Sequence, residues 1–367
     1  MEGAKIKDVT AYLESLAPVV YQESYDNSGL LTGDPNAEVR GILVTLDCTE
    51  AVIEEAIRVN CNMIVAHHPI LFKGIKKLTG KTYVERTLIK AIRHEVAIYA
   101  IHTNLDNVHE GVNKMIAEKI GLKNTKVLLP RGDTLSKLET FIPKESLEAV
   151  MEALHAAGAG QIGNYKNCSF QSEGTGTFQP NENASPFIGK TGQAERVNEL
   201  KVEVLFPSHL RPGILSALQR SHPYEEVAYY ITKLDNTNQE VGAGLIGELD
   251  VDVEPIIFLQ RLKQHMNLSV VRHTALSAKP VRRVAICGGA GSFLLGEAIA
   301  QEADVFVSSD FKYHEFFDAE GKITIADIGH YESEQFTKEL LNKVLSKKFT
   351  TFAINFSKTV TNPISYL

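Results

Sequence analysis

The sequence contains few cysteines, and their spacing excludes the sites that cysteine usually builds. The 367 residues include four of them, Cys48, Cys61, Cys168 and Cys287. None stands in a Cys-x-x-Cys pair, which argues against a disulfide framework and against a zinc site made of thiolates. Reduced thiols are typical of the cytosol, so we expect a cytoplasmic protein.

Long apolar runs and an excess of positive charge are also missing. The sequence has no stretch of 18 apolar residues, which argues against a membrane-spanning helix. Residues 1–8 mix acidic and basic side chains without an apolar segment, so we expect no secretory signal. The formal net charge of -7 gives no general attraction for nucleic acid. With 44% hydrophobic and 23% charged residues, the composition is that of a soluble globular protein.

Three short apolar segments each end in side chains that can bind a metal ion. Residues 63–66 lead into His67 and His68, residues 96–101 lead into His102 and Asp106, and residues 323–329 lead into His330 and Glu334. Imidazole is the commonest protein ligand for zinc and iron. A single His-His pair is more often two residues of a surface loop, but three such strand ends in one chain predict a shared metal site.

Two of these segments have local features that favour a site. Pro69 follows His67 and His68 directly, and because proline ends ladder pairing, both imidazoles can leave the strand toward one place. His330 and Glu334 are four residues apart at the start of a predicted helix, a spacing that puts both on one face. These two side chains could therefore hold one ion together.

Strands alternate with helices in the first and last thirds of the chain. Residues 41–47 and 63–66 predict strands, whereas residues 50–59 and 82–94 predict helices. This alternation is typical of an α/β fold with a largely parallel sheet. In such sheets ligands bind beyond the carboxyl ends of the strands, which is where the candidate metal ligands stand.

A different pattern occupies the middle of the chain. An alternating strand that ends in proline and precedes a helix occurs twice, with strands at residues 138–143 and 202–207 and helices at residues 145–156 and 212–220. A strand should follow each helix, at about residues 169–171 and at residues 226–233, and residues 158–192 are interpreted as long loops. Two β-α-β units make a ferredoxin-like sandwich.

The change of pattern predicts a discontinuous core. We expect a metal-binding α/β core with a parallel-type sheet, formed by residues 1–127 and 241–367. The α+β domain at residues 128–240 is expected to be inserted into it.

Two loops leave their roles open. Lys73, Lys76 and Lys77 form a positively charged loop that could grip an anionic substrate or simply be solvated. Residues 288–292 form a glycine-rich loop before a predicted helix, where a phosphate could bind. That loop lacks the Walker lysine, so a tight strand-to-helix turn is the favoured interpretation.

Five motifs carry a resemblance to a known family: residues 26–30, 65–69, 101–106, 309–314 and 329–334. In these motifs the chain resembles the NIF-three-like family, also called the GTP cyclohydrolase I type 2-like family. They occur in the family's order and span nearly the whole chain outside the insert. Residues 158–165, 168–170 and 222–226 resemble the PII-like or CutA-like domain of the longer bacterial members.

The resemblance implies a site for two divalent metal ions in a toroidal homohexamer with the sites facing an inner cavity. The family's ligands fall on His67, His68, Asp106, His330 and Glu334, and His102 lies close by as a ligand or as a group behind the ligands. Zinc and iron suit this set, and manganese is also compatible. Asp106 and Glu334 could bridge the ions.

The catalytic residues are not identified by this reasoning. Asp310 and His314 are candidates for proton transfer, and structural hydrogen bonding is an equal alternative for both.

The resemblance implies a metal-dependent hydrolase acting on a nucleotide such as GTP, in which an activated water attacks a purine carbon. The alternative is a protein that binds, delivers or senses metal without turnover, with the PII-like insert as its regulatory part. A third hypothesis, a ring that encloses nucleic acid, is disfavoured by the net charge of -7. The sequence has no separate guanine-recognition signature, so the first two hypotheses stay open.

Overall fold

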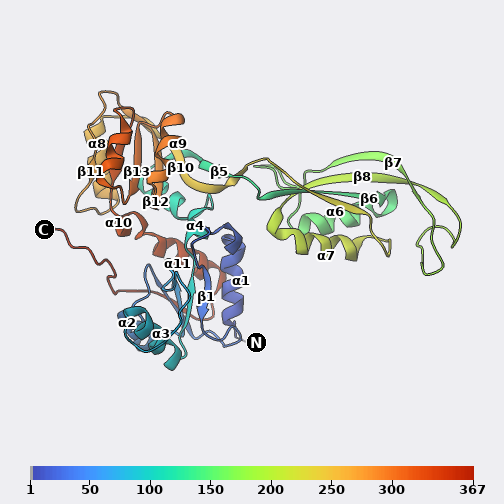
Figure 1. Ribbon diagram of the computed structural model, residues 1–367, viewed down its shortest axis with the longest axis horizontal. Helices are drawn as coiled ribbons and strands as arrows, with labels where there is room; N and C mark the ends of the chain where they lie inside the picture. Colours follow the sequence, from blue (N-terminus) through green and yellow to red (C-terminus); the bar gives the residue numbers. More distant parts are fainter. Residues whose placement is uncertain (1–2) are drawn as a thin grey trace. The chain divides into compact units, whose positions relative to one another are not determined.

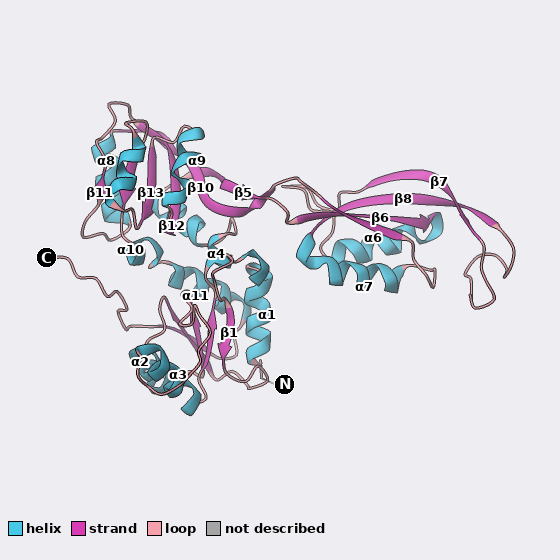
Figure 2. Cartoon of the chain, viewed as in Figure 1, coloured by secondary structure: helices cyan, strands magenta, loops and turns pink. Residues whose placement is uncertain are grey.

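The computed structural model describes residues 3–367, which form a mixed α/β fold (Figure 1 and Figure 2). Contacts divide the chain into two compact units. The first unit, called the core, ends at Leu129 and resumes at Glu240, and the second, called the insert, spans Pro130–Gln239. Among the described residues, no helix combines the length and the apolar character needed to cross a membrane.

One sheet of the core has five strands in the order β1-β4-β3-β2-β15. β2 (Gly41–Thr45), β3 (Met63–Ala66), β4 (Ala97–Ala100) and β15 (Ala353–Phe356) run parallel, and β1 (Gly29–Thr32) pairs antiparallel with β4. The strands predicted at residues 41–47 and 63–66 are confirmed. β15 was not predicted, because it has only four residues and is partly exposed.

Both faces of this sheet are covered, which explains why β2 and β3 are apolar at nearly every position. Leu43 and Ile64 pack in one buried cluster with side chains of α2 and α3, whereas Val44 and Val65 pack in another with α1. Thr49 begins α2 as predicted, because its hydroxyl accepts a hydrogen bond from the backbone N–H of Val52.

The helices of the core vary from a single turn to three turns. They are α1 (Ile6–Leu16), α2 (Glu50–Arg58), α3 (Tyr83–Arg93), α4 (Thr103–Asp106), α5 (Val112–Ile120), α8 (Pro255–His265), α9 (Leu295–Ala300), α10 (His330–Glu334) and α11 (Thr337–Lys348). Short 3-10 helices are η1 (Val19–Tyr21), η4 (Ser292–Leu294) and η5 (Tyr313–Ala319) in the core, and η2 (Lys144–Ser146) and η3 (Ser208–Leu210) in the insert.

A second core sheet has six strands in the order β11-β14-β13-β12-β10-β5. They are β5 (Lys123–Arg131), β10 (Asn238–Val253), β11 (Arg272–His273), β12 (Val281–Ala290), β13 (Val305–Ser309) and β14 (Thr324–Asp327). β12, β13 and β14 run parallel, whereas β10 and β11 pair antiparallel with their neighbours. The core therefore contains two sheets with parallel centres and antiparallel strands beside them.

The two core sheets share one hydrophobic cluster. It contains Val44 and Val65 of the first sheet together with Ile286 and Val307 of the second. Side chains of α5 and α11 belong to the same cluster. The candidate metal ligands follow the carboxyl ends of β3, β4 and β14.

The insert is a four-stranded antiparallel sheet in the order β7-β8-β6-β9 with two helices. Its elements are β6 (Leu135–Pro143), α6 (Leu147–Ala156), β7 (Phe170–Phe178), β8 (Glu195–Pro207), α7 (Arg211–Ser221) and β9 (Tyr229–Lys233). Both helices cover one face of the sheet (Figure 1), where Leu138, Val202 and Leu154 form its buried cluster.

One sequence interpretation of the insert needs correction. Residues 158–192 are not only loops, because β7 occupies Phe170–Phe178 within them. β7 is an edge strand with two glycines and mostly exposed side chains. It therefore lacks the apolar alternation from which a strand is recognised.

Candidate metal centre

His67 and His68 directly follow β3, and their rings lie side by side. The chain continues beside β2 past the end of the strand, since the His67 and His68 N–H groups donate to the carbonyls of Thr45 and Leu46 at 3.2 and 2.9 Å. Their rings are 4.9 Å apart and tilted by 46°, and His67 is 0% exposed. The pair is thus part of the interior and not a surface loop.

Asp106 is the last residue of α4, the single turn that follows β4, and His102 directly precedes that turn. The spacing of four residues places both side chains on one side of that turn. The His102 ring lies 5.4 Å from the His67 ring and 5.2 Å from the His68 ring. His102 is only 8% exposed, and Phe72 covers it with a ring distance of 5.7 Å.

His330 and Glu334 come from α10, which begins just after β14. Gly329 precedes the helix at φ 88°, a conformation that glycine tolerates best. Gly289 also has a positive φ, 64°, and a Cβ there would lie 2.4 Å from Oε1 of Glu334. Residue 289 must therefore be glycine, so that the side chain of Glu334 can approach the backbone there.

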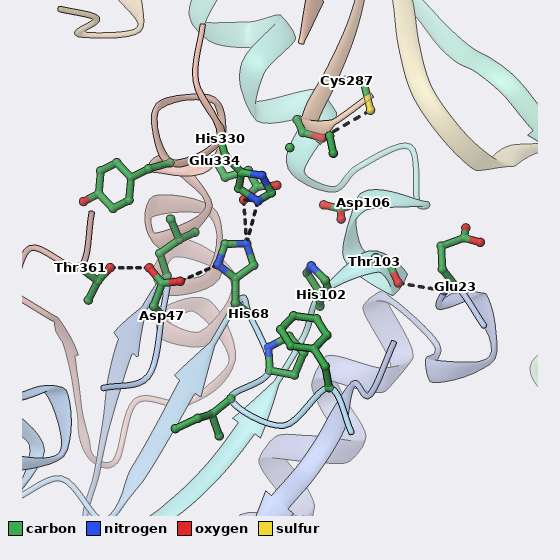
Figure 3. A pocket seen from close by; sticks show the side chains of 18 of the residues that line it. Glu23, Asp47, His68, His102, Thr103, Asp106, Cys287, His330, Glu334 and Thr361 are labelled. Carbon is green, nitrogen blue, oxygen red and sulfur yellow. Dashed lines mark hydrogen bonds and ion pairs between the residues drawn. The ribbon is translucent and has the colours of Figure 1, made fainter. Parts of the chain in front are cut away.

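Figure 3 shows His68, His102, Asp106, His330 and Glu334 around one space. In one set, the His67 Nε2 lies 3.6 Å from Asp106 Oδ1 and 3.8 Å from Glu334 Oε1. In the other, Oε2 of Glu334 lies 2.9 Å from the His68 Nε2 and 3.2 Å from the His330 Nε2. The two oxygens of Glu334 therefore serve two separate sets of ligand atoms.

A further set brings the imidazole of His102 together with those of His67 and His68, with one nitrogen of each within 4.8 Å of the others. The structure thus gathers all six residues that were predicted as ligands or near-ligands.

In each of the four histidines, Nδ1 forms a hydrogen bond with an oxygen of the protein. A metal-binding imidazole usually has such a partner, which fixes the ring and leaves Nε2 for the ion. The pairs are His67 with the Ile101 carbonyl (2.8 Å), His68 with Asp47 (2.8 Å), His102 with Asp26 (2.8 Å) and His330 with Asp310 (2.7 Å).

The carboxylates around two of the histidines favour a proton on each ring. Burial opposes charge on His68, but its hydrogen bonds to Asp47 and Glu334 outweigh burial and raise the pKa of His68 to about 10. Burial likewise opposes charge on His330, and its bonds to Asp310 and Glu334 raise the pKa of His330 to about 11. The site attracts positive charge strongly.

The two carboxylates at the centre differ. Burial opposes the ionisation of Glu334, yet its interactions with the imidazoles of His330, His67 and His68 hold the pKa of Glu334 well below its usual range. Asp106 lacks such donors, so burial and then the charge of Glu334 raise the pKa of Asp106 to about 7. The Asp106 side chain keeps 20% exposure, but its Oδ1 is buried.

The positions of these nitrogen and oxygen atoms suit coordination of a metal ion better than hydrogen bonding to each other. The His67 Nε2 and the Asp106 Oδ1 are buried without a hydrogen-bond partner among the described residues. Their separation is 3.6 Å, and the His68 and His330 Nε2 atoms are 3.4 Å apart. Two atoms that share one tetrahedral ion at ~2.1 Å are roughly 3.4 Å apart. The residues present therefore suit a bound ion.

The ligands open into a cavity of about 680 Å³, called the metal pocket. Among the described residues, its lining includes no lysine or arginine. Aromatic side chains are frequent in the lining: Tyr25, Phe72, Tyr83, Phe293 and Tyr331. The pocket thus combines an acidic, imidazole-rich floor with apolar walls.

Several residues singled out from the sequence lie elsewhere. Lys73, Lys76 and Lys77 are exposed and do not line the metal pocket. His314 is also outside the lining, exposed beside Tyr313 with their rings 5.2 Å apart. Asp310 contacts the site only through its hydrogen bond to His330.

The prediction of a loop at residues 288–292 was wrong for its first part, because Gly288, Gly289 and Ala290 belong to β12 and only Gly291 separates that strand from η4. The Gly288 N–H donates to the Asn113 side chain at 2.9 Å, and the Gly289 N–H donates to the Ser333 hydroxyl at 3.0 Å. Two of the N–H groups that could hold a phosphate are therefore already used.

Sequence reasoning missed the oxygens behind the histidines and the C-terminal segment. Asp47 ends a predicted strand and Asp26 lies in a recognised motif, but neither was assigned to a histidine. The segment from Thr361 to Ile364 lines the metal pocket, and the Thr361 hydroxyl donates to Asp47 at 2.5 Å. Nothing in the local sequence of that segment indicates this position.

The fold and the pocket together define an α/β protein with a candidate histidine-carboxylate metal centre. The family described as Duf34/NIF3 (NGG1p interacting factor 3) matches residues 4–363, and the chain belongs to this family.

Several proteins of similar length match this chain over nearly all of its residues. A Staphylococcus epidermidis protein named GTP cyclohydrolase 1 type 2 homolog is 37% identical, over 99% of this chain and 100% of its own. A Bacillus subtilis protein of the same name is also 37% identical, over 98% of each chain. A crystal structure of a Bacillus cereus protein related to NIF3 superimposes with a TM-score of 0.88 at 36% identity, over 100% of each chain.

Proposed function

We propose that the protein binds two divalent metal ions in the core and is a metal-dependent hydrolase that acts on a nucleotide. The observation that carries the proposal is the position of Glu334, whose two oxygens each belong to a different set of ligand atoms. His67 and Asp106 complete one set, and His68 and His330 complete the other. Zinc and iron both suit this mixture of imidazole and carboxylate, and manganese is compatible.

The protein's own side chains would prepare the site for hydrolysis. Two divalent ions, when bound, supply Lewis acidity and lower the pKa of a coordinated water. Asp47 and Asp310 orient His68 and His330 through hydrogen bonds of 2.8 and 2.7 Å. Phe72 over His102 restricts the access of bulk water to the floor of the metal pocket.

The nucleotide substrate is supported by the walls of the metal pocket and by the names of the relatives. Aromatic side chains such as Tyr25, Phe72 and Phe293 line the pocket and offer flat surfaces on which a base can stack. Two relatives carry the name GTP cyclohydrolase 1 type 2 homolog. Because the described lining has no lysine or arginine, phosphates would have to be neutralised by the ions. Asp310 serves as a positioning residue in this proposal, and the exposed His314 has no role.

The second candidate is a protein that binds or delivers metal without turnover. One observation favours it: among the described residues, the lining of the metal pocket includes no lysine or arginine that could hold an anionic substrate. Under this alternative the same ligands hold the same ions, and the insert regulates binding. The two candidates differ only in whether a product forms.

The assembly and the insert belong to the same proposal. We propose a cytoplasmic, toroidal homohexamer, which light scattering should report as six times the chain mass of 40.5 kDa.

We also propose that residues 128–240 are an inserted ferredoxin-like domain of the PII or CutA type. The compact unit Pro130–Gln239 and its strand order β7-β8-β6-β9 support this assignment. Replacing residues 128–240 by a short linker should leave a folded core that binds metal.

The test of the proposed activity has two readouts. Elemental analysis of the protein after reconstitution with zinc or iron should find about two ions per chain. The metal-loaded protein is then incubated with a panel of nucleotides, GTP first, and products are separated by chromatography. A metal-dependent product that disappears in Asp106→Ala supports the hydrolase. Two ions per chain without any product would select the non-catalytic alternative, and a stoichiometry near zero would remove both.

A further inference from the structure

The insert has an open sheet face on the side away from α6 and α7. Along β8, Val202 and Val204 point into the helix-covered cluster, so Glu199 and Lys201 point to the opposite face. In the pairing of β7 with β8, Gly174 lies opposite Glu199. This end of the open face therefore combines a glycine on the edge strand with a carboxylate on the neighbouring strand.

A cavity of about 860 Å³, called the insert pocket, lies on this face. β7 and β8 contribute to its lining together with parts of the loop between them and the segment before β9, residues 224–228. Every lining residue belongs to the insert. The volume is within the range of roughly 300–1,000 Å³ that is typical of small-molecule sites.

The two glycines of β7 create the hollow. A Cβ on Gly174 would meet nothing within 4 Å, so the space above it is empty. A Cβ on Gly176 would lie 2.1 Å from Oε2 of Glu199, so this carboxylate occupies the place that a side chain would fill. Glu199 is only 9% exposed. A largely buried carboxylate at the edge of an empty space favours a positively charged ligand.

The lining of the insert pocket carries a negative charge. Four carboxylates line it, from Glu173, Glu199, Glu225 and Glu226, against one ammonium group, from Lys201. That ammonium group is already paired with Glu139 at 3.0 Å and Glu203 at 3.2 Å, neither of which lines the pocket. The pocket thus attracts cations and repels phosphates and other anions.

Aromatic rings stand beside the carboxylates. The Tyr224 ring is 6.2 Å from the Phe178 ring, 6.3 Å from the Phe187 ring and 4.9 Å from the His222 ring. The hydroxyl of Tyr224 is buried, and its interaction with the carboxylate of Glu199 adds to the effect of burial in raising the pKa of Tyr224. Faces of aromatic rings attract organic cations, and such rings around a cation are a known recognition mode.

We propose that the insert pocket binds a small organic cation, with an ammonium or guanidinium group that pairs with Glu199 and packs against the rings of Tyr224, Phe178 and Phe187. A metal ion fits less well. Throughout residues 3–367, the groups of three or more metal-binding side chains that lie close together all belong to the core. The Tyr224 hydroxyl can accept a hydrogen bond from the same ligand.

The full-length protein tests this proposal by calorimetric titration with three probes: choline, agmatine and putrescine. The uncharged alcohol 3,3-dimethylbutan-1-ol has the shape of choline and serves as the neutral control. Saturable binding of at least one cation, with a dissociation constant of roughly 1 mM or lower, is expected without binding of the alcohol. Absence of saturable binding of all three cations, or equal binding of the alcohol, overturns the proposal.

Two variants locate the binding. Glu199→Gln keeps the shape and removes the charge, and Gly174→Val fills the hollow with a residue that strands favour. Each should weaken the binding of the cation by about tenfold or more. Glu152→Gln is the control, since Glu152 is exposed on α6 and lies outside the lining.

The outcome is decided by the pattern across the variants. Folding of each variant is verified by an unchanged melting temperature and an unchanged metal content of the core. Equal affinity in all the variants would place the cation elsewhere and contradict the assignment. Zinc binding that depends on Glu199, without binding of any organic cation, would contradict it as well.

Discussion

In the metal pocket, four imidazoles direct Nε2 inward and each has a hydrogen bond behind it. In the insert pocket, a single buried carboxylate, that of Glu199, leans over Gly176 beside aromatic rings. The first arrangement fixes several donor atoms at the separations that one ion requires. In the second arrangement, the shape and the negative charge of the pocket select the ligand. Several histidines that are each held by a hydrogen bond favour a metal ion, whereas a single carboxylate beside aromatic rings favours an organic cation.

The largest expected effect concerns Glu334, because both sets of ligand atoms include it. Glu334→Gln should lose both ions, whereas Asp106→Asn should lose mainly the ion that His67 and Asp106 share. Elemental analysis after dialysis against a weak chelator measures the difference. Glu118→Gln, an exposed change on α5, is the control and should keep both ions. If Glu334→Gln and Asp106→Asn retained the same metal content, Glu334 would not be the shared ligand.

The next effect concerns the residues behind the histidines. Asp47→Asn and Asp310→Asn each weaken the orientation of one histidine, His68 or His330. Loss of such a partner typically lowers metal affinity by about 10–100-fold. Because both histidines belong to one set of ligands, competition with a chromophoric chelator should show one weakened ion and one unchanged ion in either variant.

The same design tests His102. Asp26→Asn removes the carboxylate that accepts from its Nδ1 at 2.8 Å. If His102 is a ligand, this change should also weaken metal binding. Unchanged affinity for both ions in Asp26→Asn would assign His102 to a supporting position.

A smaller effect is the pH dependence of metal binding. Hydrogen bonds to carboxylates outweigh burial and raise the pKa of His68 to about 10 and that of His330 to about 11. At pH 7 the metal-free protein therefore holds protons that an ion must displace, so binding should release protons and strengthen as the pH rises. Calorimetry in two buffers with different ionisation enthalpies measures the release. Identical heats in both buffers would show that no proton is displaced.

The sequence predicted that the candidate ligands lie together, because each pair of them comes shortly after a short apolar strand. His67 and His68 after β3 and His330 after β14 depend only on local order along the chain. The oxygen behind each histidine depends on long-range pairing: Asp47 meets His68 across neighbouring strands, and Asp310 adopts a positive φ of 58° beside His330. No local pattern reveals such contacts.

The insert shows the same limit more clearly. Its alternating strands at residues 138–143 and 202–207 were recognisable because one face is buried by helices. The prediction placed this strand only at about residues 169–171, whereas β7 spans Phe170–Phe178. Its glycines and exposed polar residues give no periodic pattern from which the full strand could be recognised. The insert pocket depends on those glycines, so the sequence did not predict the pocket either.

The smallest expected effect concerns a buried carboxylate that needs no ligand, which provides a contrast with Glu199. Glu55 is 3% exposed, and it accepts hydrogen bonds from the hydroxyls of Ser357 and Thr359 and from the N–H groups of Lys358 and Thr359. Burial opposes its charge, but these bonds outweigh burial and lower the pKa of Glu55 to about 2. The carboxylate therefore fastens the chain after β15 to α2.

Glu55→Gln should reduce the free energy of unfolding by ~1–3 kcal/mol, because the amide cannot accept from all of these donors. The pKa of Glu55 is lower in the folded chain than its usual value of 4.5, so its contribution is complete above that value. The contribution falls as the pH decreases toward the folded pKa of about 2. Urea denaturation at pH 7 and pH 3 measures both effects: the difference between wild type and variant should shrink at pH 3. A difference that is the same at both pH values would show that the charge of Glu55 does not hold the C-terminal segment.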